Sequence, residues 1–294
     1  MATGVSLHIG INDVDPTCYD GWNDPLGGCE RDADDMHALA VEQGFLATLL
    51  KSPDATRDAV YQAVRDAAAR LRKGDIFLLT YAGHGGQVLD VSGDEKDDPG
   101  ATVIEGDIDD TDETWCLYDG QLLDDELRAL WPEFAAGVRI LVISDSCHSG
   151  SATRAIDAGA HTAADLSDEQ KLAIYGTTNL RFRYMPREAA VKAYAESHEF
   201  YDAIQKKLPN PPKPIAATVR LISGCKDDQL AGDDDDNGVF TGRLKKVWKN
   251  GKFKGDYAAF HEKIVAGMPE DQTPVHSIIG APNASFDAQR PFTV

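Results

Sequence analysis

The chain has 294 residues, of which 42% are hydrophobic and 27% are charged, and its formal net charge at pH 7 is −20. This length and apolar content allow a sizeable core and exclude a chain that is disordered throughout. The acidic excess argues against binding to nucleic acid or to an anionic membrane, because both require a basic surface. It favours cationic substrates or bound cations, although most of the 49 acidic residues are expected simply to keep the surface soluble.

Five cysteines, at positions 18, 29, 116, 147 and 225, show no disulfide-framework or zinc-finger spacing. Their odd number fits reduced thiols. Residues 1–6 contain no basic region followed by an apolar run, and no apolar segment reaches the length of a membrane span. We therefore expect cytoplasmic residence.

Short apolar runs alternate with helical patterns along the chain, which is typical of a doubly wound α/β fold. Strands are predicted near residues 5–11, 46–50, 75–82, 138–145, 217–223 and 275–279. Helices are predicted near residues 31–43, 55–72, 121–130, 198–207, 239–249 and 256–267. The pattern predicts a six-stranded sheet with helices on both faces. Residues 87–119 and 151–197 interrupt the alternation; the first range is predicted to be a long loop or excursion after His84, and the second a long segment after Cys147.

Two short motifs follow buried strands and place a histidine and a cysteine at strand ends. The first is Tyr-Ala-Gly-His-Gly-Gly, with His84, and the second is Asp-Ser-Cys-His-Ser-Gly, with Cys147. If the two strands are neighbours, the side chains meet at the edge of the sheet where α/β proteins bind ligands. The motifs therefore predict a nucleophilic thiol with an adjacent base.

A cysteine attacks as the thiolate, and an imidazole assists the loss of the proton. His84 is the expected base, although His148 is a competing base by sequence position. The backbone N–H groups of Gly85 and Cys147 are candidates for an oxyanion hole. These residues provide the nucleophile, the base and the oxyanion hole that a cysteine hydrolase requires.

The two motifs resemble the histidine and cysteine motifs of the caspase-like peptidases, and the second closely matches the metacaspase and orthocaspase form. Further similar segments are Gly28–Ala33, Leu123–Leu127 and Ser223–Gln229, in the order of the family. The resemblance implies a caspase-like three-layer sandwich with a mostly parallel six-stranded sheet. It also implies a monomer, as in metacaspases.

The resemblance further implies one caspase-like domain over residues 1–294. Residues 1–150 resemble the large subunit, residues 198–294 the small subunit, and residues 151–197 a linker that is cleaved or rearranged on activation. The basic residues of this segment are expected to be exposed: Arg154, Arg181, Arg183 and Arg187.

A pocket for an arginine or lysine side chain needs carboxylates near the nucleophile. Asp145 precedes Cys147 by two residues, and by resemblance Asp145 and Asp32 line a basic-specific first pocket. Asp32 also fits ordinary helix-start chemistry. The resemblance assigns Ser223 and Asp228 to substrate binding as well.

Two positions depart from the metacaspase pattern, Arg31 in place of asparagine and Ala82 in place of serine. An arginine beside Asp32 can pair with it and weaken the charge of the pocket. Specificity is therefore less firmly predicted than catalysis.

Many metacaspases need calcium, and by resemblance Asp124 and Asp125 belong to that site, with Asp112 or Glu113 as a third ligand. Ca²⁺ takes several oxygen ligands of this kind. The alternative is that Asp124 and Asp125 only start a helix. We expect Ca²⁺ and no organic cofactor.

Together these features predict a cysteine endopeptidase that cleaves proteins or peptides after Arg or Lys, possesses a Cys147/His84 dyad and processes itself. The alternatives are a caspase-fold binding or scaffold protein without turnover and a peptidase with another first-pocket preference, such as Asp. The acidic residues Asp32 and Asp145 disfavour a preference for Asp.

Overall fold

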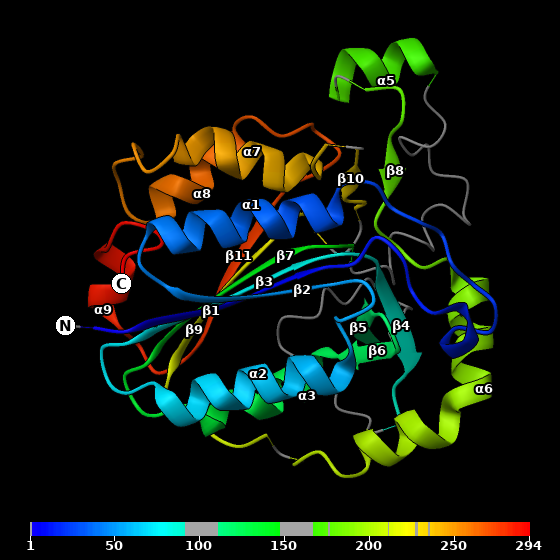
Figure 1. Ribbon diagram of the computed structural model, residues 1–294, viewed down its shortest axis with the longest axis horizontal. Helices are drawn as coiled ribbons and strands as arrows, with labels where there is room; N and C mark the ends of the chain where they lie inside the picture. Colours follow the sequence, from blue (N-terminus) through cyan, green and yellow to red (C-terminus); the bar gives the residue numbers. More distant parts are fainter. Residues whose placement is uncertain are drawn as a thin grey trace, which may run out of the picture.

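The computed structural model describes residues 2–91, 111–147, 167–175, 177–210, 212–226, 229–234 and 236–294. A six-stranded sheet lies at the centre, between two layers of helices (Figure 1). Its strands, in spatial order, are β11 (Val275–Gly280), β9 (Thr218–Ser223), β7 (Arg139–Asp145), β3 (Ile76–Ala82), β1 (Gly4–Gly10) and β2 (Leu46–Lys51). All pairs are parallel except β11 with β9. The predicted sheet is confirmed strand for strand.

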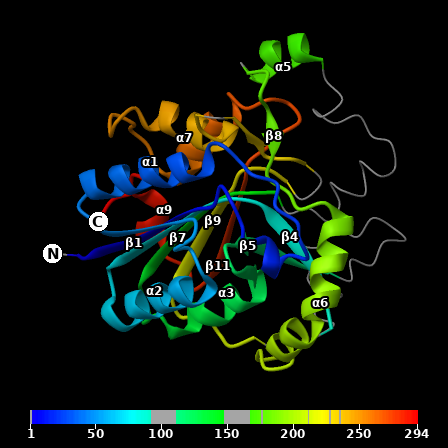
Figure 2. The same ribbon diagram turned by 45° about the vertical axis from the view of Figure 1, so that its right-hand side comes forward.

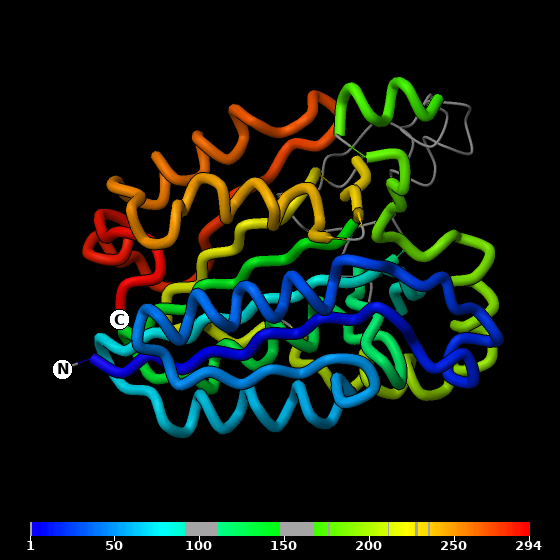
Figure 3. Tube along the Cα trace, turned by 45° about the horizontal axis from the view of Figure 1, so that its top comes forward, coloured from blue at the N-terminus to red at the C-terminus, as the bar shows by residue number. Residues whose placement is uncertain are grey.

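One face of the sheet carries α1 (Cys29–Glu42), α7 (Val239–Trp248) and α8 (Tyr257–Val265), and Figure 3 shows α1 and α7 side by side over it. The other face carries α2 (Arg57–Arg70) and α3 (Asp124–Leu130).

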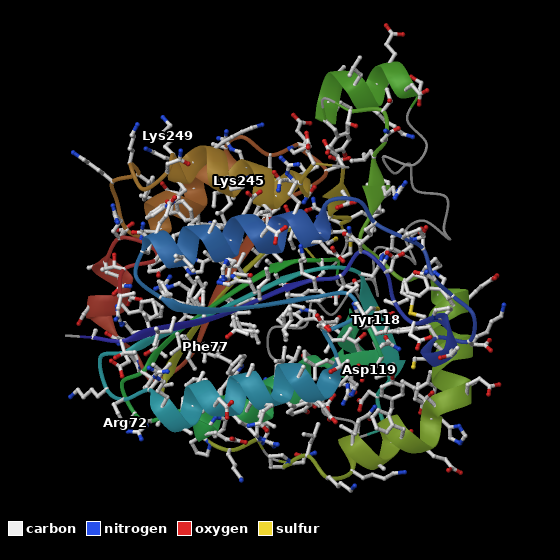
Figure 4. The ribbon with its side chains drawn as sticks, in the orientation of Figure 1. Arg72, Phe77, Tyr118, Asp119, Lys245 and Lys249 are labelled. Carbon is white, nitrogen blue, oxygen red and sulfur yellow. The ribbon has the colours of Figure 1, made fainter. Side chains whose placement is uncertain are left out.

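The strand period of two divides the core between these faces. In β3, Phe77 and Leu79 belong to the apolar cluster on the α2 side, whereas Ile76 and Leu78 belong to the cluster on the α1 side. Figure 4 shows Phe77 between the sheet and α2, and Lys249 on the outer surface beyond α7. A strand buried on both faces needs a continuous apolar run, which explains why the sequence reveals it.

Two smaller sheets extend the carboxyl end of the central sheet. The first contains β4 (Gly85–Leu89), β5 (Thr111–Leu117) and β6 (Gly120–Leu123), and the second pairs β8 (Arg181–Phe182) with β10 (Gly232–Asp233). The described part of residues 87–119, predicted to be a long loop or excursion, is therefore an excursion that contains strands. The sequence does not predict these strands, because they contain glycine and acidic residues, such as the buried Asp112, which are rare in strands.

Helix α6 (Arg187–Gln205) is longer than the helix predicted near 198–207 and begins inside the segment 151–197. Two shorter helices, α5 (Asp168–Tyr175) and α9 (Ala284–Ala288), were not predicted. In Figure 2, α5 and β8 lie on one side of the carboxyl end of the sheet and α6 lies on the other. Among the described residues, no helix combines the length and the hydropathy of a membrane span.

Candidate active site

The two sequence motifs meet because β3 and β7 are neighbours. Ala82 is paired in register with Asp145, so His84 and Cys147 each follow two residues beyond the carboxyl ends of adjacent parallel strands. Both side chains are buried, with 2% and 0% of their surface exposed. The topology therefore brings a thiol and an imidazole to one place, as the sequence predicts.

The orientation of His84 follows from its contacts. Its Nε2 lies 2.6 Å from the carbonyl oxygen of Asp24, and its ring packs edge-on against Trp22 at 4.9 Å between centroids. A carbonyl oxygen only accepts, so Nε2 carries the proton and Nδ1 is the acceptor in the neutral ring. Nδ1 is buried and has no hydrogen-bond partner among the described residues. Burial lowers the pKa of His84, which favours the neutral ring that a base requires.

The carbonyl oxygen of Arg183 lies between two backbone donors. It accepts the N–H of Gly85 at 2.9 Å and the N–H of Cys147 at 3.1 Å. These are the two amides that the sequence assigns to an oxyanion hole, and the distances fit that role. A Cβ atom on Gly85 would lie 1.6 Å from the carbonyl oxygen of Cys147, so only glycine fits here.

The residues around this carbonyl bind as an added β-strand. Phe182 pairs antiparallel with Gly232, and the N–H of Arg183 donates to the carbonyl of Ala231 at 3.0 Å. The Sγ atom of Cys147 accepts the N–H of Ala231 at 2.7 Å. The chain thus presents its own backbone beside the thiol in the manner of a peptide substrate.

The guanidinium of Arg183 fills a pocket made of three carboxylates. Nη2 lies 2.5 Å from Asp32 and 2.6 Å from Asp233, and Nη1 lies 3.1 Å from Asp145. Arg183 has 0% of its surface exposed, and each of the three aspartates has 1% exposed. Guanidinium forks match carboxylates well, so the geometry of the pocket fits a planar cation.

The carboxylates are held by groups from distant segments. Thr241 donates to Asp145 from its N–H at 3.0 Å and from its hydroxyl at 2.6 Å, and the N–H of Gly238 donates to Asp32 at 3.1 Å. A Cβ atom on Gly238 would come within 2.6 Å of the Arg183 guanidinium. The start of α7 therefore forms a wall of the pocket that requires glycine.

Burial and charge act against each other in this pocket. Burial raises the pKa of Asp32 to about 7 and also raises the pKa of Asp145, although Arg183 opposes both shifts. Burial favours the neutral form of Arg183, but Asp145 and the other carboxylates hold its pKa well above the usual value. The guanidinium stays charged, and Asp32 titrates near neutral pH.

Two expectations about the basic residues are wrong. Arg183 was expected to be exposed and is fully buried, because the carboxylates compensate its charge. Arg31 does not pair with Asp32; it pairs on the surface with Asp236 at 3.3 Å. The arginine that compensates the negative charge of the pocket is therefore Arg183 rather than Arg31.

Asp233 is the pocket residue that the sequence does not identify. It lies in the acidic run at residues 233–236, whose composition is typical of a solvent-exposed loop, and the pairing of β10 with β8 buries the Asp233 carboxylate in the pocket. Burial opposes its ionisation, but Arg183 and the amides of Gly27 and Gly28 bring its pKa below the ordinary value. The position of Asp233 in the pocket therefore follows from strand pairing and could not be predicted from the composition of the segment.

Other predicted site residues lie elsewhere or outside the described residues. The hydroxyl of Ser223 donates to the carbonyl of Cys225 at 3.2 Å, so it holds its own loop beside the pocket. Asp228 and His148 are outside the described residues. Their assigned roles stay predictions.

The predicted calcium ligands are only partly brought together. Asp124 and Glu113 line one groove, whereas the neighbouring Asp112 lies on the opposite face of β5 and is buried. Asp125 follows Asp124 in the first turn of α3. Within the described ranges, no three His, Cys, Asp or Glu side chains form a group that could hold a metal ion. These residues alone do not form a complete calcium site, and Glu113 fits beside Asp124 better than Asp112 does.

A thiol, an imidazole and two aligned amides lie at the carboxyl end of a three-layer α/β sheet, and these are the groups that a cysteine peptidase of the caspase fold requires. A family model described as the caspase domain matches residues 3–286, so the chain belongs to the caspase-domain peptidases, a family of cysteine-type endopeptidases.

Among proteins with similar sequences are Metacaspase-1A of Neurospora crassa, 28% identical over 78% of this chain, and Metacaspase-1 of Schizosaccharomyces pombe, 26% identical over 83%. The chain spans 51% and 58% of the length of these two relatives. It is thus similar to about half of each.

Two solved structures are similar as well. Protein GSU0716 of Geobacter sulfurreducens is 47% identical, with 99% of each chain covered and a TM-score of 0.83. Caspase-1 of Spodoptera frugiperda is 11% identical, with 95% of this chain and 86% of that chain covered and a TM-score of 0.53, and this likeness shows the fold alone.

Proposed function

We propose that the chain is an endopeptidase that cleaves after Arg, and after Lys less efficiently, through Cys147 and His84. The observation that carries this proposal is the placement of Arg183, whose side chain fills an acidic pocket while its carbonyl accepts the amides of Gly85 and Cys147. One residue thus occupies both the specificity pocket and the oxyanion site. A substrate arginine fits the same two places.

In the mechanism, Nδ1 of His84 takes the proton of the Cys147 thiol. The thiolate attacks the carbonyl carbon of the substrate's Arg residue, and the oxygen becomes an oxyanion between the Gly85 and Cys147 amides. The C–N bond then breaks, and His84 gives its proton to the leaving amine. Water, deprotonated by His84, hydrolyses the thioester and releases the carboxylic acid. The carbonyl of Asp24 keeps the ring of His84 oriented throughout.

The pocket argues for a cationic rather than an acidic substrate. Three carboxylates surround one guanidinium, so an Asp side chain in this place would add a fourth buried negative charge. Lysine brings one point charge to the same pocket, whereas arginine brings a fork that reaches Asp32, Asp145 and Asp233 together.

The same geometry supports self-processing at the Arg183–Tyr184 bond. Residues 181–183 already lie as a bound strand, so cleavage there would free the pocket once the segment ending at Arg183 departs. The uncleaved chain is then a zymogen whose own arginine blocks the pocket. Monomeric state, cytoplasmic residence and calcium activation are further parts of the proposal.

Paired fluorogenic peptides that end in Arg, Lys or Asp test the proposed function, with wild type and Cys147→Ala, in calcium and in chelator. Release from the Arg and Lys peptides, absent in the variant, is expected. Mass spectrometry of the wild type should show a fragment that begins at Tyr184. Failure to cleave any peptide under any condition would favour the non-catalytic scaffold instead.

A further inference from the structure

The chain on the far side of the Arg183–Tyr184 bond is held as specifically as the arginine itself. Gly85 donates its N–H to the Arg183 carbonyl, and its own carbonyl accepts the N–H of Met185 at 2.7 Å. Gly85 and Tyr184 thereby form a parallel β-bridge. The first residue of β4 therefore clamps the backbone on both sides of the bond that is presented to Cys147.

Met185, the second residue after this bond, is anchored by its side chain. It has 1% of its surface exposed and belongs to the large apolar cluster that also contains Trp115 of β5 and Ala190 of α6. Tyr184, the first residue after the bond, is only partly buried, and it packs against the cluster of Cys147 and Ala231. The apolar anchor is thus at the second position.

The two sides of the bond differ in how firmly the rest of the chain holds them. On the amino side, α5 has no buried residue. On the carboxyl side, α6 buries Ala190 and Tyr201, and the amide group of Gln205 donates to the Leu89 carbonyl at 2.8 Å and accepts the Val91 N–H at 2.6 Å. Cleavage would therefore leave residues 184–186 tethered beside β4 by α6.

We infer that β4 and the space that the Met185 side chain fills within its apolar cluster, called here the Met185 cavity, form a second specificity site. This site takes a large apolar residue two positions after the cleaved bond. This inference rests on the proposed function and adds a substrate class to it: polypeptides with Arg, then any residue, then a large apolar residue. The backbone bonds of Gly85 fix the register, so the second side chain enters the cavity.

The tethered end of the processed chain competes for the same cavity. Three residues, Tyr184, Met185 and Pro186, lie between the cleaved bond and the start of α6. The effective concentration of Met185 at the site is therefore high. A substrate that extends past the cleaved bond must displace Met185, whereas a short Arg substrate with a fluorophore as its leaving group does not. The site therefore selects substrates and restrains the enzyme at once.

Internally quenched peptides test the inference on the self-processed wild type. Three peptides share Arg and the following residue and carry Met, Ala or Asp at the second position; a short Arg fluorogenic substrate is measured in parallel. We expect kcat/KM for the Met peptide to exceed that for the Asp peptide about tenfold or more. Equal values within twofold, with the short substrate cleaved, would overturn the second site alone. Failure to cleave the short substrate as well would overturn the proposed function and the site with it.

A variant comparison tests the competition. Met185→Asp should raise the ratio of kcat/KM for the long Met peptide over that for the short substrate several-fold, because a charged side chain leaves the apolar cavity. Val191→Ala on α6, which changes a side chain that is 59% exposed, is the matched control and should leave the ratio unchanged. An unchanged ratio in Met185→Asp would overturn the competition, and the peptide series judges the cavity even if this variant does not fold.

Discussion

Two buried arginines of this protein differ in the charge that surrounds them. Arg57 of α2 pairs with Glu126 of α3 at 2.7 Å and donates to the carbonyl of Gln121, so one cation meets one carboxylate. Arg183 meets three carboxylates. Both guanidiniums are buried, yet only the first site is neutral.

A neutral buried pair suits a permanent structural contact, because either charge left alone in the interior is costly. The site of Arg183 retains an excess of negative charge even when filled. Such a site strongly attracts any cation that can enter, and it lies beside a thiol rather than between two helices. The difference separates an arginine that holds the fold together from one that occupies a binding pocket.

The largest expected effect is the loss of turnover in Cys147→Ala. We expect the rate with an Arg peptide to fall at least about a thousandfold, because no other thiol can form the acyl intermediate. Cys18→Ala, which removes a half-buried thiol from the 3-10 turn Pro16–Cys18, is the control and should keep full activity. Thermal unfolding of both variants should match the wild type. A fully active Cys147→Ala would refute the assigned nucleophile.

The comparison of the two arginine sites is sharpened by removing one carboxylate from each. Asp233→Asn should raise KM for Arg peptides about tenfold or more, since a charged contact to the guanidinium is lost. Glu126→Gln should leave KM unchanged but lower the free energy of unfolding by about 3 kcal/mol, because Arg57 stays buried without its partner. Peptide kinetics and chemical denaturation measure the two effects. The opposite pattern would mean that the structural and binding sites have been exchanged.

The pH dependence should divide between kcat and KM. The pKa of Asp32 is raised to about 7, so below this pH the carboxyl is neutral and binds a guanidinium more weakly. KM for an Arg peptide is therefore expected to fall as the pH rises from about 6 to about 8. Burial lowers the pKa of His84, so the acid limb of kcat should lie below the usual histidine value of 6.5. Asp32→Asn should remove the KM dependence and leave the kcat limb in place.

A smaller effect is expected from the choice between arginine and lysine. An Arg peptide should have a kcat/KM about tenfold above that of the matching Lys peptide, since the fork contacts several carboxylates at once. Ornithine and citrulline peptides complete the series by varying length and charge. A Lys preference would indicate that one carboxylate dominates the pocket.

The smallest effect concerns the acidic residues of α3. At saturating calcium, Asp124→Ala should reduce cleavage of an Arg peptide less than Asp145→Ala does, because Asp145 contacts the guanidinium and Asp124 lies in a separate groove. Titration with calcium and with a chelator measures the metal dependence directly. The reverse order would mean that pocket and metal residues have been confused.

The sequence alone predicts the central sheet and the two motifs that end β3 and β7. Strands buried on both faces are continuous apolar runs, and α2 carries Val60, Val64 and Ala67 on one buried face. Both patterns depend only on residues that are close together in the sequence, so they can be recognised without knowledge of the rest of the chain. His84 and Cys147 follow from the motifs at the ends of these strands. The pocket role of Asp145 follows from its place two residues before Cys147 together with the family resemblance, and that of Asp32 from the resemblance alone.

The tertiary structure decided what fills the site. Nothing in the neighbourhood of Arg183 marks it as buried, because its partners Asp32, Asp145 and Asp233 come from three distant segments. The weak strands β4, β8 and β10 likewise form only where another strand pairs with them. Local sequence patterns report burial and periodicity, whereas charge compensation and strand pairing depend on residues that meet only in the folded chain.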